Sequence, residues 1–67
     1  MITTVKSLLM TFFWGNSIVS KSTLHRKVAN DEIIAEALAL GYISERINDN
    51  NESVYVITKK GKDFMYN

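Results

Sequence analysis

Residues 38–62 constrain the fold of this chain most, because they combine the end of a helix, two short strands and the start of another helix. Gly41 supplies the left-handed conformation with which helices commonly end. Residues 43–47 and 53–57 have the pattern of strands, and the polar segment 48–52 between them favours a turn. The pattern predicts a β-hairpin with a polar tip. Thr58 is expected to cap a short helix after it, in which Gly61 is a weak point.

The rest of the chain must cover the apolar side of this hairpin, and its first helix is expected to run from residue 3 or 4 to residue 14. Its apolar residues have the i, i+3, i+4, i+7 spacing of a helix with one buried face: Val5, Leu8, Leu9 and Phe12. Gly15 and Asn16 are expected to end this helix. Met10 and Trp14 lie opposite the apolar stripe. Either Trp14 folds back onto the domain, or Met10 and Trp14 form an exposed ridge at which a partner or a second copy of the chain docks.

A short strand and two further helices are expected between residues 17 and 40. Residues 17–19 are long enough to pair with an edge of the hairpin. Ser20 is expected to cap a second helix over residues 21–28, and Asn30 a third over residues 31–40. The side chains expected to face the core are Leu24 and Val28 in the second helix and Ile33, Ile34, Ala37 and Leu38 in the third. The hairpin mixes apolar and polar residues on each face, which leaves its register open, and Phe64 is the expected inward anchor of the last helix.

The composition fits a single folded domain that spans residues 1–67. A chain of this length buries only about 60% of the surface that its unfolded form exposes. It has no Cys with which to add a disulfide or a cysteine zinc site. With one His, no Gly-rich phosphate loop and no nucleophile signature, we expect no metal, cofactor or catalytic site. The missing signatures also lead us to expect that the protein is not an enzyme. The apolar segment near the start is too short to span a bilayer, so we expect a soluble, cytoplasmic protein.

Two segments resemble those of small bacterial and phage winged helix-turn-helix regulators, such as the MarR and PadR groups. Residues 38–43, LALGYI, look like the join between the third helix and the wing of these proteins. Residues 55–62, YVITKKGK, look like the ending of their wing. The resemblance covers nearly the whole chain. It implies an α+β winged helix-turn-helix domain with three helices, a wing sheet of two or three strands and a short C-terminal helix.

The resemblance also implies how such a domain meets double-stranded DNA. In members of this class that bind DNA, the third helix enters the major groove, the second lies across the backbone and the wing reaches a neighbouring groove. Phosphate contacts would then come from the second helix, the wing and the residues after it: Lys21, His25, Arg26, Lys27, Arg46, Lys59, Lys60 and Lys62. The face that the third helix presents to its partner would consist of Asp31, Glu32, Ala35, Glu36 and Ala39. Met10 and Trp14 would lie at the interface of a homodimer.

Two functions stay open at this point. The first is a DNA-binding transcriptional regulator that uses the basic side chains for phosphate contacts. The second is a winged helix that docks on a protein partner, as a phage-type adaptor or inhibitor of a host protein, without binding DNA. The third helix favours the second function, because a helix that reads bases usually presents Arg, Lys, Asn, Gln, Ser or Thr, whereas this one presents three carboxylates. The net charge of the whole chain, +1, gives no electrostatic preference for nucleic acid.

Overall fold

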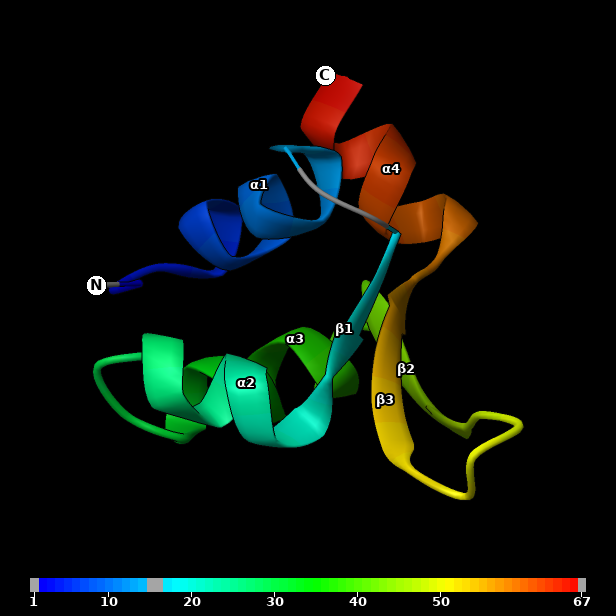
Figure 1. The fold of residues 1–67 in the computed structure, drawn as a ribbon. Coiled ribbons are helices and arrows are strands. Elements are labelled where there is room, and N and C mark those ends of the chain that lie inside the picture. The colour runs from blue at the N-terminus through cyan, green and yellow to red at the C-terminus, as the bar shows by residue number, and fades with distance from the viewer. Residues whose placement is uncertain (1, 15–16, 67) are drawn as a thin grey trace.

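The computed structural model describes residues 2–14 and 17–66, with the exception of the Trp14 side chain (Figure 1). This part of the chain forms an α+β fold of four helices and three strands, in the order α1 (Val5–Trp14), β1 (Ile18–Ser20), α2 (Lys21–Lys27), α3 (Glu32–Ala39), β2 (Ile43–Ile47), β3 (Ser53–Ile57) and α4 (Lys59–Tyr66). The strands make one antiparallel sheet in the order β1-β3-β2. The α+β class is confirmed, and the arrangement is compatible with a winged-helix-like fold. The residues predicted to end α1, Gly15 and Asn16, lie outside the described part.

The hairpin has the predicted bounds, and its register is now defined. Ile43 lies opposite Ile57, and Glu45 lies opposite Tyr55. Ile43, Tyr55 and Ile57 are buried, whereas Ile47 at the far end of β2 is 61% exposed. At this end of the sheet the β2–β3 loop projects beyond the helices (Figure 1).

The predicted inward faces of the three leading helices form the core with the sheet. Leu8, Leu9 and Leu24 are 0% exposed, and Ile34 and Phe12 are 2% exposed. Ser20 caps α2 as predicted, since its hydroxyl oxygen accepts a hydrogen bond from the amide of Thr23 at 3.3 Å. The apolar spacing therefore identified the buried side of α1, α2 and α3 correctly.

The start of α3 differs by one residue from the prediction. The helix begins at Glu32, not at residue 31, and its N-cap is Asp31 rather than Asn30. The Asn30 side chain still accepts a hydrogen bond from the Glu32 amide, at 2.8 Å. The Asp31 carboxylate makes no capping bond because it lies 2.8 Å from the His25 ring instead.

Ile2 forms a contact that the sequence pattern did not predict. Its amide donates to the Lys27 carbonyl at 2.8 Å, and its carbonyl accepts from the Ala29 amide at 2.7 Å. The side chain is 8% exposed and belongs to the core. The segment before α1 thereby holds the end of α2 in place.

The junction between α3, β2 and α4 depends on Thr58 and two glycines. Gly41 has the predicted positive φ, 78°. The Thr58 hydroxyl donates to the Gly41 carbonyl at 2.6 Å and accepts from the Gly61 amide at 3.1 Å, which confirms the predicted cap. Gly61 is more than a weak helix former, because a Cβ atom built on it would lie 2.3 Å from the Tyr42 carbonyl oxygen. The absence of a side chain lets α4 pack against the start of β2.

The prediction that Phe64 anchors α4 in the core is wrong. Phe64 is 38% exposed, and Met65 is the residue of that turn that packs against the core. The buried Gly61 defines the inner face of α4, and on a helix the residue four positions later shares that face. Met65 therefore points inward, and Phe64 lies beside it at the edge of the helix.

We predict that Gly61→Ala destabilises the fold, although alanine is the better helix former by about 1 kcal/mol. Its methyl group would overlap the Tyr42 carbonyl, and overpacking of this kind typically costs about 1–3 kcal/mol. Urea unfolding followed by circular dichroism measures the change. Lys62→Ala is a matched control on the exposed side of the same helix, and it should leave the free energy of unfolding within about 0.5 kcal/mol. A Gly61→Ala protein as stable as the natural chain would contradict this account of the junction.

Candidate functional site

The α2–α3 unit is a pair of helices joined by the short turn of residues 28–31. His25 fixes this turn to the sheet. Its Nδ1 atom lies 2.8 Å from Asp31 Oδ1, and its Nε2 atom lies 3.3 Å from the Tyr55 hydroxyl oxygen. A neutral imidazole with its proton on Nδ1 donates to Asp31 and accepts from Tyr55. One half-buried side chain therefore connects α2, the turn before α3 and the central strand β3.

Tyr55 supports this connection as a protonated phenol. Tyr55 is 2% exposed, and this burial raises the pKa of its phenol above the ordinary value. The carboxylates of Glu45 and Asp31 also raise this pKa, whereas the ammonium of Lys21 lowers it. Lys21 itself pairs with Glu45 at 3.2 Å, which joins the start of α2 to β2. The hydroxyl of Tyr55 therefore keeps its proton for His25 at neutral pH.

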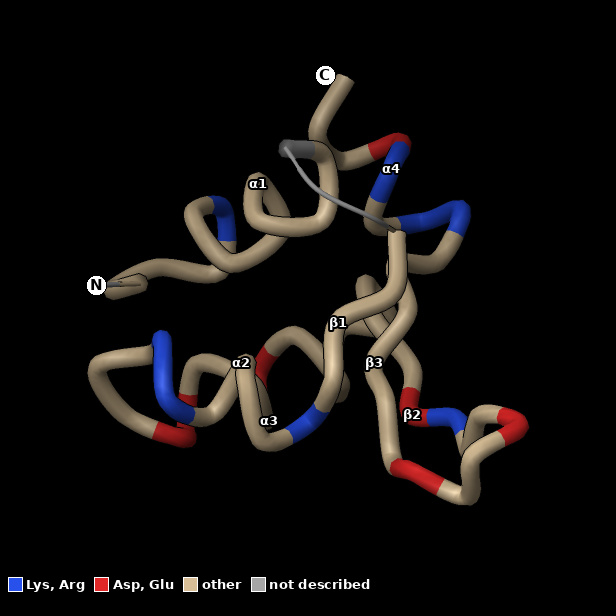
Figure 2. The backbone as a smooth tube through the Cα atoms, viewed as in Figure 1, with Lys and Arg blue, Asp and Glu red and all other residues tan. Residues whose placement is uncertain are grey.

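The structure divides the predicted phosphate-contacting residues into groups. Lys21 and His25 already have carboxylate neighbours within the chain. Arg26 and Lys27 are exposed at the end of α2 and have no carboxylate within ion-pair distance among the described residues. The others are Arg46 on β2 and, on α4, Lys59, Lys60 and Lys62, all of them exposed. Figure 2 shows the basic residues of α2 and those of α4 at separate places on the fold.

The predicted partner-facing surface of α3 is exposed along its whole length: Asp31, Glu32, Ala35, Glu36 and Ala39. Residues 31–39 contain no Lys or Arg that would offset the carboxylates. The hairpin loop adds Asp49 and Glu52, both of them exposed and visible as the acidic end of the hairpin in Figure 2. The α3 face and the hairpin tip are therefore both acidic.

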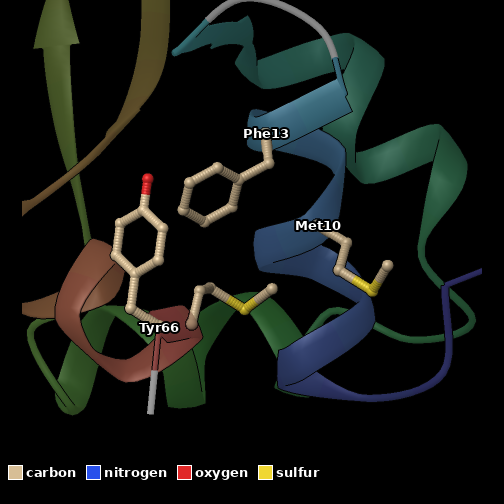
Figure 3. Close-up of a pocket in the computed structure, with 4 residues that line it drawn as sticks. Met10, Phe13 and Tyr66 are labelled. Atoms are coloured by element: carbon tan, nitrogen blue, oxygen red, sulfur yellow. The ribbon is translucent and has the colours of Figure 1, made fainter.

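An apolar groove of about 400 Å³ lies between α1 and α4, lined by Met10, Phe13, Met65 and Tyr66 (Figure 3). The rings of Phe13 and Tyr66 meet edge to face with centroids 5.6 Å apart. The exposed fractions of Phe13 and Tyr66 are 40% and 79%, and that of Met10 is 37%. The sequence predicted Met10 as a possible interface residue, but it could not include Tyr66, because the position of α4 beside α1 is not visible in a one-dimensional pattern. The homodimer interface at Met10 and Trp14 stays a prediction, and the Trp14 side chain lies outside the described part.

A second aromatic cluster lies at the junction of β2 and α4, and sequence reasoning missed it. The rings of Tyr42 and Phe64 stack with centroids 4.7 Å apart and planes inclined by 24°. The Lys60 ammonium lies 5.8 Å from the centroid of the Tyr42 ring. The spacing of Lys60 and Phe64, i and i+4 on one helix, was the signal that could have placed them on a shared face.

A hollow of mixed polarity, about 430 Å³, separates the start of α2 from the base of the hairpin loop. Its lining residues carry hydroxyls and charges of both signs: Ser20, Lys21, Ser22, His25, Glu52 and Ser53. Within residues 2–14 and 17–66, no group of three His, Asp or Glu side chains is placed to hold a metal ion. None of the helices described is long and apolar enough to cross a membrane.

Comparisons with protein-family models, with curated proteins and with solved structures give no match for this chain. A functional proposal therefore has to be argued from the fold and from the surfaces described above.

We predict that Tyr55→Phe lowers the free energy of unfolding by about 0.5–1.5 kcal/mol, the usual net value of one hydrogen bond. The substitution keeps the buried ring and removes only the hydroxyl that His25 contacts. Tyr66→Phe removes a hydroxyl from a side chain that is 79% exposed, so it should leave stability unchanged. Equal effects of the two substitutions in urea unfolding would show that the contact between His25 and Tyr55 adds nothing to stability.

Proposed function

We propose that the chain is a winged helix-turn-helix protein that binds double-stranded DNA and acts as a transcriptional regulator. The observation that supports this most is the α2–turn–α3 unit set beside an antiparallel hairpin. Two helices joined by a turn of three or four residues are the unit that many DNA-binding proteins lay across the phosphate backbone and into the major groove. The turn here has that length, since it comprises residues 28–31.

The phosphate contacts of this proposal come mainly from Arg26 and Lys27. Both side chains are exposed at the end of α2, and neither is committed to a carboxylate among the described residues. Arg46, exposed on β2, supplies a further contact from the hairpin. Because Lys21 and His25 already have acidic neighbours, they contribute less than the sequence pattern suggested.

A single chain with so few phosphate contacts binds weakly, and a symmetric pair of chains doubles their number. The proposal therefore includes a homodimer, with the groove between α1 and α4 as the interface. Met10, Phe13 and Tyr66 offer exposed apolar surface there. In this arrangement each copy contacts one half of a two-fold site on the duplex.

We predict that Arg26→Ala/Lys27→Ala weakens binding to a labelled random duplex by a similar factor for every sequence tried. Each lost phosphate contact removes about 0.9 from the slope of log affinity against log salt concentration, so the slope should fall by about 1.8 for each chain bound. Fluorescence anisotropy over a salt series measures both quantities. Lys6→Ala removes one charge from an exposed residue of α1 outside the predicted phosphate-contacting residues, and it is the matched control for Lys27→Ala alone. Absence of duplex binding by the natural chain at low salt would overturn the proposal, and equal losses in Lys6→Ala and Lys27→Ala would overturn the choice of surface.

A second candidate function is supported by the acidic surface of α3. Its exposed carboxylates at Asp31, Glu32 and Glu36, with alanines between them, form a flat face of one charge sign. Such a face complements a basic surface on a protein better than it complements the phosphates of DNA. In this alternative the chain is a protein-interaction module that docks through α3 without contacting DNA.

Glu32→Gln/Glu36→Gln distinguishes these two functions. If α3 enters the major groove, removal of two like charges should strengthen duplex binding about threefold to tenfold at low salt, and less at high salt. Asp63→Asn on α4 is the control for a lost negative charge far from the turn. Unchanged duplex affinity in the α3 variant would show that α3 does not approach DNA, and it would leave its acidic face free for a protein partner.

A further inference from the structure

We propose that the surface formed by Tyr42, Phe64 and the lysines of the first turn of α4 binds single-stranded nucleic acid. This site is separate from the α2 residues assigned to duplex DNA, and the inference does not depend on that assignment. Its ligand would place one base on the Phe64 ring and the adjoining phosphates near Lys59 and Lys60.

The first part of the argument is the position of Phe64. The inner face of α4 is already occupied by Gly61, which is buried, and by Met65, which packs against the core. Phe64 instead stacks on Tyr42 at 4.7 Å and stays 38% exposed. One side of the Phe64 ring is therefore covered by an aromatic partner, while 38% of the residue stays open to solvent. An exposed ring held in a fixed orientation by a second ring is a suitable platform for a planar base.

The second part is the charge at the start of α4. Lys59 and Lys60 are both exposed in the first turn, and this turn contains no acidic residue. The amino-terminal end of a helix carries partial positive charge, so lysines there are unfavourable for the helix itself. The helix dipole thus does not favour their position, whereas two adjoining phosphates of a bound strand would neutralise the two lysines.

The third part is the distance between the charge and the ring. The Lys60 ammonium is 5.8 Å from the centroid of the Tyr42 ring, and Tyr42 is in turn stacked on Phe64. A cation and an exposed ring on neighbouring positions match the neighbouring phosphate and base of a nucleotide. In a duplex the bases are stacked on each other and cannot reach the Phe64 ring, so the fit is to a single strand.

The test is fluorescence anisotropy with a labelled oligothymidylate long enough to cover the site. Phe64→Leu keeps an apolar side chain but removes the ring, and we expect about tenfold weaker binding, within the range known for loss of one stacked base. Phe64→Trp restores a ring and should bind at least as well as the natural chain. Lys59→Ala/Lys60→Ala should weaken binding and reduce the salt slope by about 1.4, since each single-strand phosphate contact contributes about 0.7.

Controls separate this site from the duplex site. Arg26→Ala/Lys27→Ala should leave oligothymidylate binding unchanged, and Phe64→Leu should leave duplex binding unchanged. Circular dichroism of each variant verifies that the fold is retained. Absence of oligothymidylate binding at low salt, or equal binding by the natural chain and a folded Phe64→Leu protein, would overturn the inference without affecting the duplex proposal.

Discussion

The rest of the structure depends on the contact between Thr58 and the end of the α3–β2 connection. One hydroxyl donates to the Gly41 carbonyl and accepts from the Gly61 amide, and the Thr58 amide donates to the Tyr42 carbonyl at 2.9 Å. These bonds fix where β3 ends, where α4 begins and how both lie against the chain that leaves α3. A domain of this size has a small core, so a few well-placed polar contacts decide the orientation of elements that apolar packing alone would leave adjustable.

A second polar contact, centred on His25, has the same role at Tyr55, the middle residue of β3. It connects α2 and Asp31 to the buried Tyr55 of β3. The two contacts hold α3 between them, because one lies just before this helix and the other just after it. The outward face of α3 is consequently presented in a defined direction, whichever partner it meets. The charge of that face then decides the partner, and its carboxylates make close approach to phosphates unfavourable unless basic residues on α2 and β2 compensate.

The sequence predicted what depends on local chemistry and periodicity. The bounds of the hairpin, the Ser20 and Thr58 caps and the positive φ of Gly41 follow from residue types at adjacent positions, and all are observed. The errors concern contacts between distant segments. Asn30 was predicted as the N-cap of α3 because its side chain suits that role; it does accept the bond from the Glu32 amide, but the N-cap position is Asp31, whose carboxylate meets His25. Phe64 was placed in the core because its size suggests burial. In the structure the backbone of Gly61 lies close against Tyr42, which makes the Gly61 side of α4 its inner face and turns Met65 inward instead.

The same limit applies to the candidate surfaces. A count of basic residues on α2 treats Lys21 and Lys27 as equivalent, although the structure pairs Lys21 with Glu45 and leaves Lys27 exposed without such a partner in the described part. Exposure of large apolar side chains is unfavourable for a domain with so small a core, yet Phe13, Phe64 and Tyr66 are all partly or largely exposed. They lie on α1 and α4, on the two sides of the C-terminal helix, where Phe13 meets Tyr66 and Phe64 meets Tyr42. Aromatic rings that pack on each other at the surface rather than in the core contribute less to folding than buried ones, and the proposals of a dimer interface and of a single-strand site start from this difference.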